Sequence, residues 1–385
     1  MTTTIKYILP LIFFLGVYTV FIFSSRNGLF TLLDDAIYSR TMPGGDGPIK
    51  TNLTGIKALD EGLLIHLNAF FLRVVDGSAP DLSLYAFSST GSFGAAWILI
   101  TVEAWRKGNA GTLMASVFGV GFLAQTITYA LSMTIYCMLN LWKSRTISNL
   151  TLQKIITPRI ISNTLPLALF IGYFIPTALL AAPTAIFNMD TKQSFLAAWQ
   201  LWPLTVSFLL SLTKYFSPRC TRPDNIHDRR ADILSLRYLY AFAFACAAIP
   251  HLGTWLISLT SVIYPGLFNA EYLEKLHPQR VFINKIPLDS VRVSSVEEGS
   301  LWFLQWDNTI GSISVMLWAV ALYRKACAEA KVRVSAVELG VKICLLVILG
   351  GAVGAAVELV WERDELVFSK ELEVAVEKGT GENSH

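Results

Sequence analysis

Long apolar stretches constrain the fold of this chain more than any other feature of its sequence. About eight such stretches of roughly twenty residues alternate with polar segments along 385 residues, and roughly twenty apolar residues make one helical crossing of a bilayer. Backbone groups inside a bilayer must find hydrogen bonds within the protein, so such stretches fold as helices. The sequence therefore predicts an all-α, polytopic integral membrane helical bundle with about eight transmembrane helices.

Composition supports this class and argues against others. Hydrophobic residues make up 53% of the chain and charged residues 15%, whereas soluble domains carry roughly 25% charged residues. The formal net charge is only +3 and the basic residues form no block, so we expect no nucleic-acid partner. The five cysteines are scattered, with no CxxC pair and no Cys/His cluster, which predicts neither a disulfide framework nor a zinc site.

The organisation expected from these stretches is one multi-span membrane domain over residues 1–361. The expected spans cover residues 5–24, 82–102, 113–140, 164–187, 195–215, 237–263, 301–323 and 339–361. A cleaved signal peptide is the alternative for the first stretch. Residues 59–75 are shorter and mixed in polarity, which favours an interfacial or re-entrant helix. Residues 362–385 form a polar C-terminal tail.

Asp307 lies within the expected span 301–323. An ionisable side chain at the centre of a membrane helix costs roughly 2.5–3.5 kcal/mol on insertion scales, and such residues usually have a function. The alternative is that Asp307 pairs with a buried base and only holds helices together. The purpose of this carboxyl is the main functional question that the sequence raises.

Counting crossings places a second carboxyl near Asp307. Glu103 ends the span 82–102, and four complete crossings separate it from the start of the span that holds Asp307. Both carboxyls should therefore lie toward the same membrane face, with Asp307 about 9 Å deep at 1.5 Å per residue. Residues at the start of the fifth span share that face: Trp199, Gln200 and Trp202. The alternative for these is an aromatic belt at the lipid headgroups.

An acid in an apolar, aromatic pocket is suited to protonation chemistry. Burial in a water-poor site disfavours the charged form of a carboxyl and raises its pKa, so we expect Asp307 to be a neutral proton donor. Aromatic ring faces stabilise a nearby cation. Such a site fits protonation of an alkene or epoxide followed by folding of the carbocation. A proton-coupled transporter also needs a membrane carboxyl, although the chain shows no internal repeat of the kind common in transporters. A scaffolding protein is a third alternative.

Other candidate residues also have structural explanations. His251 follows Pro250 in the sixth span and either relays a proton or bonds to the kinked helix backbone. Gln125 and Tyr129, spaced i and i+4, either line a pocket or hold two helices together. Three aspartates in the loop 216–236 are interleaved with arginines and lack a second acidic cluster, so we predict no metal and no cofactor: Asp224, Asp228 and Asp232.

Short motifs resemble one enzyme family. The sequence EAWRKGN begins at Glu103, FLQWD ends at Asp307, and residues 228–240 continue through the IPH motif at His251. These motifs resemble the fungal integral-membrane terpene cyclases of ascochlorin-, ascofuranone- and macrophorin-type meroterpenoid pathways. The resemblance covers roughly residues 59–361. Trp306 stands where many relatives have tyrosine, and the first 58 residues match no pattern of the family.

The resemblance implies a non-diphosphate-ionising cyclase of the isomerase or lyase type in secondary metabolism. Such an enzyme protonates a terminal epoxide or olefin of a prenyl chain, usually farnesyl-derived, on an aromatic or polyketide-derived head, and needs no magnesium. Asp307 is then the proton donor or its partner, and Glu103 the second carboxyl that tunes or reprotonates it. The expected pocket residues are Trp302, Trp306, Trp199, Trp202, Gln200, Gln305, Tyr129 and His251. The expected partners are an epoxy-farnesyl substrate, membrane lipid and other pathway enzymes, in the endoplasmic reticulum.

Overall fold

The computed structural model describes residues 2–44, 47–148, 150–216 and 226–382. The principal helices are α1 (Thr2–Gly16), α3 (Leu29–Ser39), α5 (Ile65–Val75), α6 (Pro80–Trp105), α7 (Val117–Lys143), α10 (Arg159–Leu169), α11 (Ile175–Ala181), α12 (Met189–Trp199), α13 (Trp202–Phe216), α14 (Ile226–Ile263), α17 (Val296–Ala330) and α18 (Ala336–Glu382). Shorter helices are α2 (Phe23–Arg26), α4 (Lys57–Leu59), α8 (Arg145–Ser148), α9 (Leu152–Ile155), α15 (Ala270–Leu276) and α16 (Pro278–Phe282). The described residues contain no β-strand.

Helices of membrane length account for most of the bundle. Six are long and apolar enough to cross a bilayer: Thr4–Arg26, Val117–Lys143, Leu152–Ala181, Arg230–Ile263, Val296–Glu329 and Ala336–Ser369. The pair α12 and α13, bent by 51°, is a seventh candidate within the described chain. The all-α membrane fold class is therefore confirmed, with six or seven such helices where about eight were expected.

The expected span 82–102 corresponds to α6, which is long but does not meet the same test of apolar character. This helix carries several Ser, Thr and Gly residues and lies at the centre of the bundle, packed against α14, α17 and α18. Small residues allow close helix packing, and a helix surrounded by protein needs no lipid-like surface. Burial in the bundle explains why α6 is less apolar than its neighbours.

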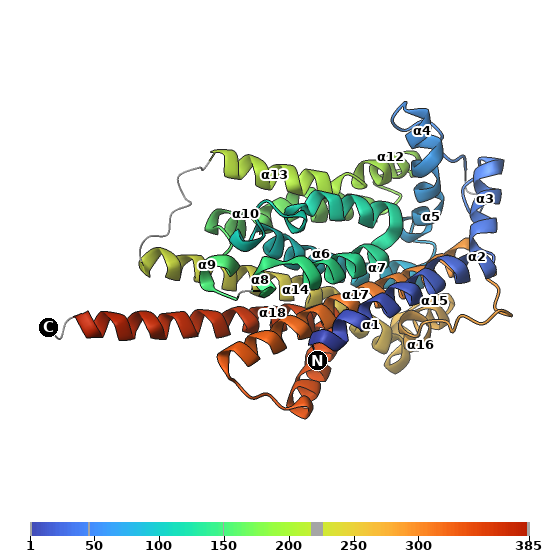
Figure 1. Ribbon diagram of the computed structural model, residues 1–385. Helices are drawn as coiled ribbons and strands as arrows, with labels where there is room; N and C mark the ends of the chain where they lie inside the picture. Colours follow the sequence, from blue (N-terminus) through green and yellow to red (C-terminus); the bar gives the residue numbers. More distant parts are fainter. Residues whose placement is uncertain (1, 45–46, 149, 217–225, 383–385) are drawn as a thin grey trace.

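Helix α7 is broken near its middle. Ile127 and Thr128 have non-helical backbone angles, and Thr128 has a positive φ of 77°. A positive φ is unusual for a β-branched residue. Residues 117–126 therefore form one helical segment and residues 129–143 another. Figure 1 shows the ribbon reversing its direction close to the label α7.

The second segment of α7 runs parallel to the end of α6. Contacts between the two advance together along both helices: Tyr129 packs on Phe93, the Tyr136 hydroxyl donates to the Ile100 carbonyl, and the Ser144 hydroxyl donates to Asn109. The first segment runs the other way, because Gly121 lies against Trp97. The chain thus enters and leaves α7 at the same end of the bundle. The stretch 113–140 has the length and apolar character of a crossing, but in the structure its two halves form a hairpin within the bundle.

The polar tail expected at 362–385 does not begin at residue 362. Helix α18 continues to Glu382 and bends at Gly351, whose φ is +67°. Arg363, Asp364 and Phe368 are all buried against the bundle. Residues 59–75, expected to form an interfacial or re-entrant helix, are helical. Helix α5 packs against α3, α6, α12 and α17.

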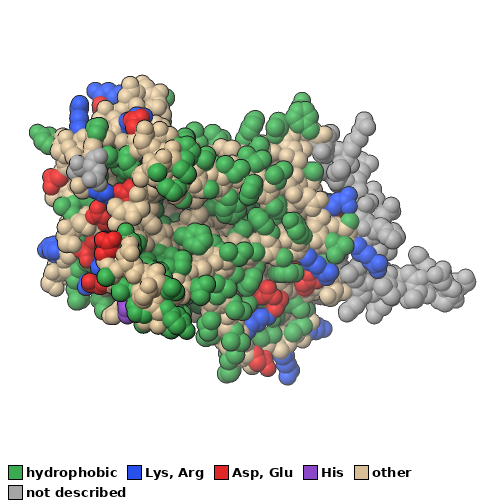
Figure 2. Space-filling model, turned by 180° about the vertical axis from the view of Figure 1, so that it is seen from behind, with side chains coloured by type: hydrophobic (Ala, Val, Ile, Leu, Met, Phe, Trp, Pro, Cys, Tyr) green, Lys and Arg blue, Asp and Glu red, His purple; other side chains and the backbone are tan. Residues whose placement is uncertain are grey.

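Charged and apolar side chains occupy different parts of the surface. Figure 2 shows hydrophobic side chains over the middle of one face, with Lys, Arg, Asp and Glu gathered at the left end and at the lower right. The exposed apolar side chains include Leu256 and Leu345, each on a helix of membrane length, and Phe208 on the bent pair α12 and α13. This distribution fits a bundle whose middle contacts lipid and whose ends contact water.

Candidate active site

A cavity of about 1420 Å³ lies inside the bundle toward the end that holds α3 and α5. Its wall is formed by residues of α3, α5, α6, α7, α11, α12, α14 and α17. Aromatic side chains make up much of this wall, among them Phe70, Phe93, Tyr129, Tyr173, Trp199 and Phe303. Small-molecule pockets usually measure roughly 300–1,000 Å³. The cavity therefore has room for a long ligand with a bulky end group.

Asp307 lies on this wall and is 8% exposed. Its Oδ1 atom accepts a hydrogen bond of 2.7 Å from the backbone N–H of Ala130. The first N–H groups of a helix lack partners within the helix, and the break at Thr128 makes Ala130 one of the first residues of the second segment of α7. Asp307 therefore caps this segment in the way that a carboxylate caps an ordinary helix N-terminus.

Two further donors lie beside the Asp307 carboxyl: the Thr128 hydroxyl and the Tyr129 backbone N–H. The Thr128 hydroxyl has no other hydrogen-bond partner among the described residues. The Gln125 side chain, one turn earlier on the same wall, has a buried amide nitrogen that is also unpaired. Unpaired polar groups are uncommon in protein interiors. This part of the wall has hydrogen-bonding capacity that a ligand can use.

Asp307 forms no ion pair with any described residue. The groups around it are neutral: Asn308 donates to the Tyr85 hydroxyl at 3.3 Å, and the Tyr129 hydroxyl is 3.5 Å from that of Ser312. The alternative that Asp307 only pairs with a buried base is therefore wrong. What remains is a buried carboxyl on the cavity wall that is held by neutral donors from the broken part of α7.

Glu103 lies at the opposite end of α6 from the Asp307 site. Tyr85 of α6 donates to the Gln305 carbonyl, next to Asp307, at 3.3 Å. Glu103 is eighteen residues further along the same helix, which corresponds to roughly 27 Å at 1.5 Å per residue. The prediction that the two carboxyls share a membrane face is therefore wrong. It failed because α7 returns to the end from which it started, so one of the four crossings counted from the sequence does not exist.

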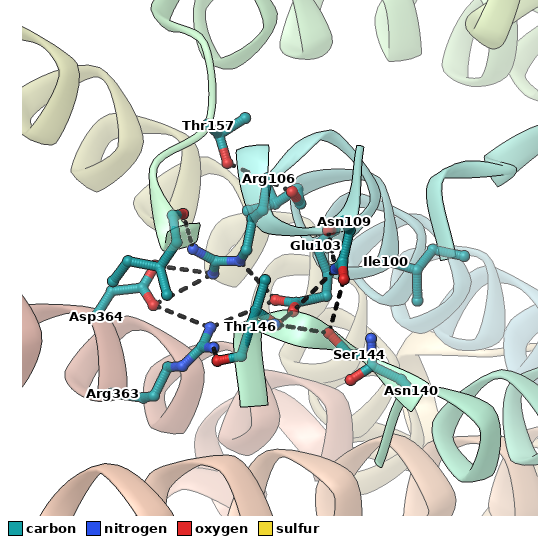
Figure 3. A network of polar contacts seen from close by, with 12 residues as sticks. Ile100, Glu103, Arg106, Asn109, Asn140, Ser144, Thr146, Thr157, Arg363 and Asp364 are labelled. Carbon is teal, nitrogen blue, oxygen red and sulfur yellow. Dashed lines mark hydrogen bonds and ion pairs between the residues drawn. The ribbon is translucent and has the colours of Figure 1, made fainter. Parts of the chain in front are cut away.

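Figure 3 shows that Glu103 belongs to a closed network of polar contacts. Arg106 Nε donates to Glu103 Oε2 at 2.5 Å, and Arg106 Nη2 donates to Asp364 Oδ2 at 2.9 Å. Arg363 Nη1 lies 3.4 Å from Glu103 Oε2 and 3.2 Å from Asp364 Oδ1. All four charged side chains are at most 1% exposed. Two guanidinium groups and two carboxylates thus neutralise one another.

Neutral side chains complete this network, which we call the Glu103 cluster (Glu103, Arg106, Thr146, Arg363 and Asp364). The Thr146 hydroxyl donates to Glu103 Oε1. The Tyr240 hydroxyl of α14 donates to Asp364 Oδ2 at 2.7 Å. The cluster therefore joins α6, α8 and α18, and Tyr240 connects it to α14. Since Glu103 is absent from the cavity wall and its oxygens are occupied, it does not meet Asp307.

The three candidates at the start of the fifth expected span have different environments. Trp199 lines the cavity and donates its indole N–H to Thr177 at 2.9 Å. Trp202 is buried behind the wall, with its ring centroid 4.6 Å from those of Trp97 and Tyr173. Gln200 is buried, and neither of its amide atoms has a partner. Only Trp199 of these three belongs to the cavity lining.

The remaining candidates lie outside the lining, except for Tyr129. Trp302 stacks on Phe23, and Trp306 donates its indole N–H to the Lys285 carbonyl at 2.9 Å. Gln305 donates to backbone carbonyls of residues 280 and 281. His251 packs against Gly351 at the bend of α18. The structure thus brings together Asp307, Tyr129 and Trp199, and places the other expected site residues elsewhere.

Several wall residues were not identified from the sequence. The aromatic side chains of Phe70, Phe93, Tyr173 and Phe303 face the cavity. Of these, only Phe303 could have been predicted from the sequence, because it precedes Asp307 by one helical turn and so lies on the same face of the helix. The others are aromatic residues of apolar helices, which in sequence look the same as residues that face lipid.

The relatives found by comparison with known proteins are all fungal proteins named terpene cyclase. The model of the CtvD domain family matches residues 5–368. The chain is 31% identical over 358 residues to the terpene cyclase ctvD of Aspergillus terreus, a match that covers 91% of this chain and 96% of the relative. It is 29% identical to the terpene cyclase penA of Penicillium crustosum, over 94% and 96% of the two chains, and 34% identical to the terpene cyclase verU1 of Penicillium polonicum, over 83% of each. No solved structure gives a significant match.

Proposed function

This chain belongs to the CtvD domain family, and from that premise we propose that it is a terpene cyclase that folds a prenyl chain inside the cavity beside Asp307. The resemblance to fungal terpene cyclases that the motifs indicated is confirmed at the level of the family. The names of the relatives support a cyclase activity. The observation that carries the proposed chemistry is the position of Asp307 as the buried carboxyl on an aromatic, largely apolar cavity wall.

Asp307 acts as the Brønsted acid in this proposal. Its Oδ2–H bond breaks as the proton passes to the terminal epoxide oxygen or terminal alkene carbon of the substrate. Opening of the epoxide C–O bond, or protonation of the alkene, leaves a tertiary carbocation that the π electrons of the next double bond attack. The last cation loses a proton to the Asp307 carboxylate, which restores the acid. The Ala130 N–H on Oδ1 holds the carboxyl in one orientation throughout.

The cavity wall contributes shape and electrostatics. Phe93, Tyr129 and Phe303 surround the position of Asp307 with ring faces and edges. Ring faces attract a cation through their quadrupoles, an effect that grows when water is excluded. The apolar wall also limits the access of water, which would otherwise capture the cation before the rings close. Because no diphosphate leaves, the proposal requires no metal ion.

Glu103 has a structural role in this proposal rather than a catalytic one. Tyr85 contacts Gln305 and Phe93 packs on Tyr129 beside Ala130, and these two residues of α6 precede Glu103 by roughly 27 Å and about 15 Å along the helix. The Glu103 oxygens bond instead to Arg106 and Thr146. Reprotonation of Asp307 then requires no second protein carboxyl, since the final deprotonation of the product returns the proton. The single acid is sufficient for a redox-neutral cyclisation.

The substrate and its setting are also proposals. Helices of membrane length contribute to the wall of the cavity, which supports a lipophilic prenyl chain as the substrate. We propose a farnesyl-derived chain on an aromatic or polyketide-derived head, cyclised in the endoplasmic reticulum as a step of fungal meroterpenoid metabolism. The enzymes that prenylate and epoxidise such a head are the expected pathway partners.

Replacement of Asp307 by asparagine tests the proposal. Asparagine keeps an oxygen that accepts from the Ala130 N–H but has no acidic proton. Microsomes with Asp307→Asn, fed an epoxyfarnesyl arene, should form cyclic product at least about 100-fold more slowly than wild type, the usual contribution of a general acid. Accumulation of the protein should be unchanged.

The matched control is Asp289→Asn, at an exposed aspartate that pairs with Arg26 and is not part of the cavity wall. This variant should retain full activity. Wild-type rates in Asp307→Asn would rule out Asp307 as the acid, and absence of cyclic product from the wild type would rule out the substrate class.

A further inference from the structure

The hydroxyl groups on the cavity wall are mostly satisfied within the protein. Ser83 donates to the Val74 carbonyl at 2.7 Å, Ser89 to that of Tyr85 at 3.0 Å, and Thr90 to that of Ala86 at 2.8 Å. A hydroxyl that donates to its own backbone has little capacity left for a ligand. The part of the wall that these residues form therefore behaves as a largely apolar surface toward a ligand.

Two ionisable side chains on the wall have no such partner. Asp34 of α3 and His66 of α5 both line the cavity, and both are exposed. Neither forms a hydrogen bond or an ion pair with any residue that the structure describes. Apart from Asp307, they are the only Asp, Glu, His, Lys or Arg side chains among the described residues of this lining. The cavity thus has a second polar region, at its exposed margin.

Aromatic side chains separate this margin from Asp307. His66 precedes Phe70 by one turn of α5, and Phe303 precedes Asp307 by one turn of α17. The rings of Phe70 and Phe303 pack edge to face with centroids 4.9 Å apart. Helices α3 and α5, which carry the margin, pack together at one end of the bundle, as Figure 1 shows. The rings of Phe70 and Phe303 therefore lie between the part of the wall that holds His66 and the part that holds Asp307.

We propose that Asp34 and His66 bind the polar head group of the substrate, a ring that bears hydroxyl groups, and thereby set which end of the prenyl chain reaches Asp307. This inference rests on the proposed function. A carboxylate accepts hydrogen bonds from ring hydroxyls, and an imidazole both donates and accepts. The prenyl chain follows the apolar wall inward, because burial of its surface is favourable there. The reverse orientation would place a polar ring against Phe70 and Phe303 and leave Asp307 without a substrate atom to protonate.

The test compares substrates with and without the head group. Cyclisation rates are measured in microsomes for an epoxyfarnesyl arene with free ring hydroxyls and for an epoxyfarnesyl chain that ends in a methyl group. Asp34→Ala and His66→Ala should each raise KM for the arene roughly ten-fold, the effect of losing one hydrogen bond to a charged group. The kcat for the arene and both constants for the methyl-terminated chain should change less than about two-fold, since the reacting end is untouched.

A matched control and a binding measurement complete the design. Asp35→Ala removes the neighbouring exposed aspartate, which is not part of the cavity wall, and should change neither constant. Binding of the arene is measured separately in Asp307→Asn protein, where turnover is blocked, with and without Asp34→Ala. The double variant should bind roughly ten-fold more weakly.

The outcomes separate the two proposals. Equal Kd values with and without Asp34, or equal KM effects on both substrates, would overturn the head-group assignment and leave Asp34 and His66 as solvated surface groups. A wild type that forms no cyclic product from either substrate would instead overturn the proposed function, while the binding measurement would still decide whether the margin recognises the head.

Discussion

The two buried carboxyls Asp307 and Glu103 have opposite environments within one bundle. Glu103 contacts two buried guanidinium groups and a threonine hydroxyl, and all the charges of its cluster are paired. Asp307 has no charged partner among the described residues and bonds through one oxygen to a backbone N–H. A charge that is fully paired has no chemistry left to perform, whereas a single carboxyl on a cavity wall does. Burial alone does not distinguish a structural acid from a reactive one, but the count of partners does.

The largest effect is expected in an experiment that tests whether the Glu103 end and the Asp307 end of the bundle lie on opposite sides of the membrane. Because α7 turns back, Ala110 and Ser148 should lie on the Glu103 side of the membrane and Ser290 on the opposite side. Each of the three residues is exposed. In a background with the native cysteines replaced, Ala110→Cys and Ser148→Cys should react with an impermeant maleimide from one side of sealed vesicles, and Ser290→Cys only from the other.

An all-or-none difference is expected in this labelling. Opposite labelling of Ala110→Cys and Ser148→Cys would mean that α7 crosses the membrane completely. In that case four crossings would separate Glu103 from Asp307, as the sequence predicted, and the two carboxyls would lie toward the same membrane face.

The largest effect on stability is expected in the Glu103 cluster. Glu103→Ala leaves two buried guanidinium groups with a single carboxylate, and removal of one partner from a buried ion pair costs about 3–5 kcal/mol. The thermal midpoint in detergent and the yield of folded protein should both fall sharply. The double variant Glu103→Leu/Arg363→Leu removes one charge of each sign and keeps the Arg106–Asp364 pair, so it should recover much of this loss.

The double variant also separates structure from catalysis. If it is folded and forms cyclic product at a rate near that of wild type, Glu103 is structural. If it is folded but inactive, Glu103 takes part in the reaction and the contrast between the two carboxyls is mistaken.

A smaller effect on stability is expected at Asp307. Asp307→Ala removes the acceptor for the Ala130 N–H, and loss of a helix cap costs typically about 1 kcal/mol. Asp307→Asn keeps an acceptor and should be more stable than Asp307→Ala, while both variants are inactive. Thermal midpoints of the two proteins in detergent check the order. Identical midpoints would show that the cap contributes nothing, and the break in α7 would need another explanation.

The smallest effect is expected for Tyr129→Phe. The hydroxyl that is lost is 3.5 Å from Ser312, so stability should fall by less than about 1 kcal/mol. The ring stays on the cavity wall beside Phe93, and the cyclisation rate should remain within a few-fold of wild type. Tyr129→Leu provides the comparison, because it removes the ring and should slow cyclisation more. A large loss of rate in Tyr129→Phe would assign a chemical role to the hydroxyl.

Residues of the site differ in how far the sequence could predict them. Asp307 was identifiable because a carboxyl interrupts an apolar span, and Tyr129 because it follows Gln125 by one turn. Trp302, Trp306 and Gln305 were expected beside Asp307 on grounds of proximity in sequence. In a helix, neighbours in sequence point in different directions, and these three instead bond or stack outside the cavity lining. The EAWRKGN motif contributes Glu103 and Arg106 to the buried ionic cluster and does not contribute to the cavity wall.

The amino-acid sequence by itself determined that the chain is a bundle of long helices with an acid inside it. This follows from local physics: each apolar stretch must satisfy its own backbone hydrogen bonds, and a carboxyl among apolar residues is costly wherever it lies. Only the tertiary structure decided which carboxyl faces the cavity. The break at Ile127 and Thr128 contains neither glycine nor proline, and the N–H of Ala130 that it frees is satisfied by Asp307 from another helix. A reversal held by a contact between segments 177 residues apart leaves no periodic or compositional mark in the sequence.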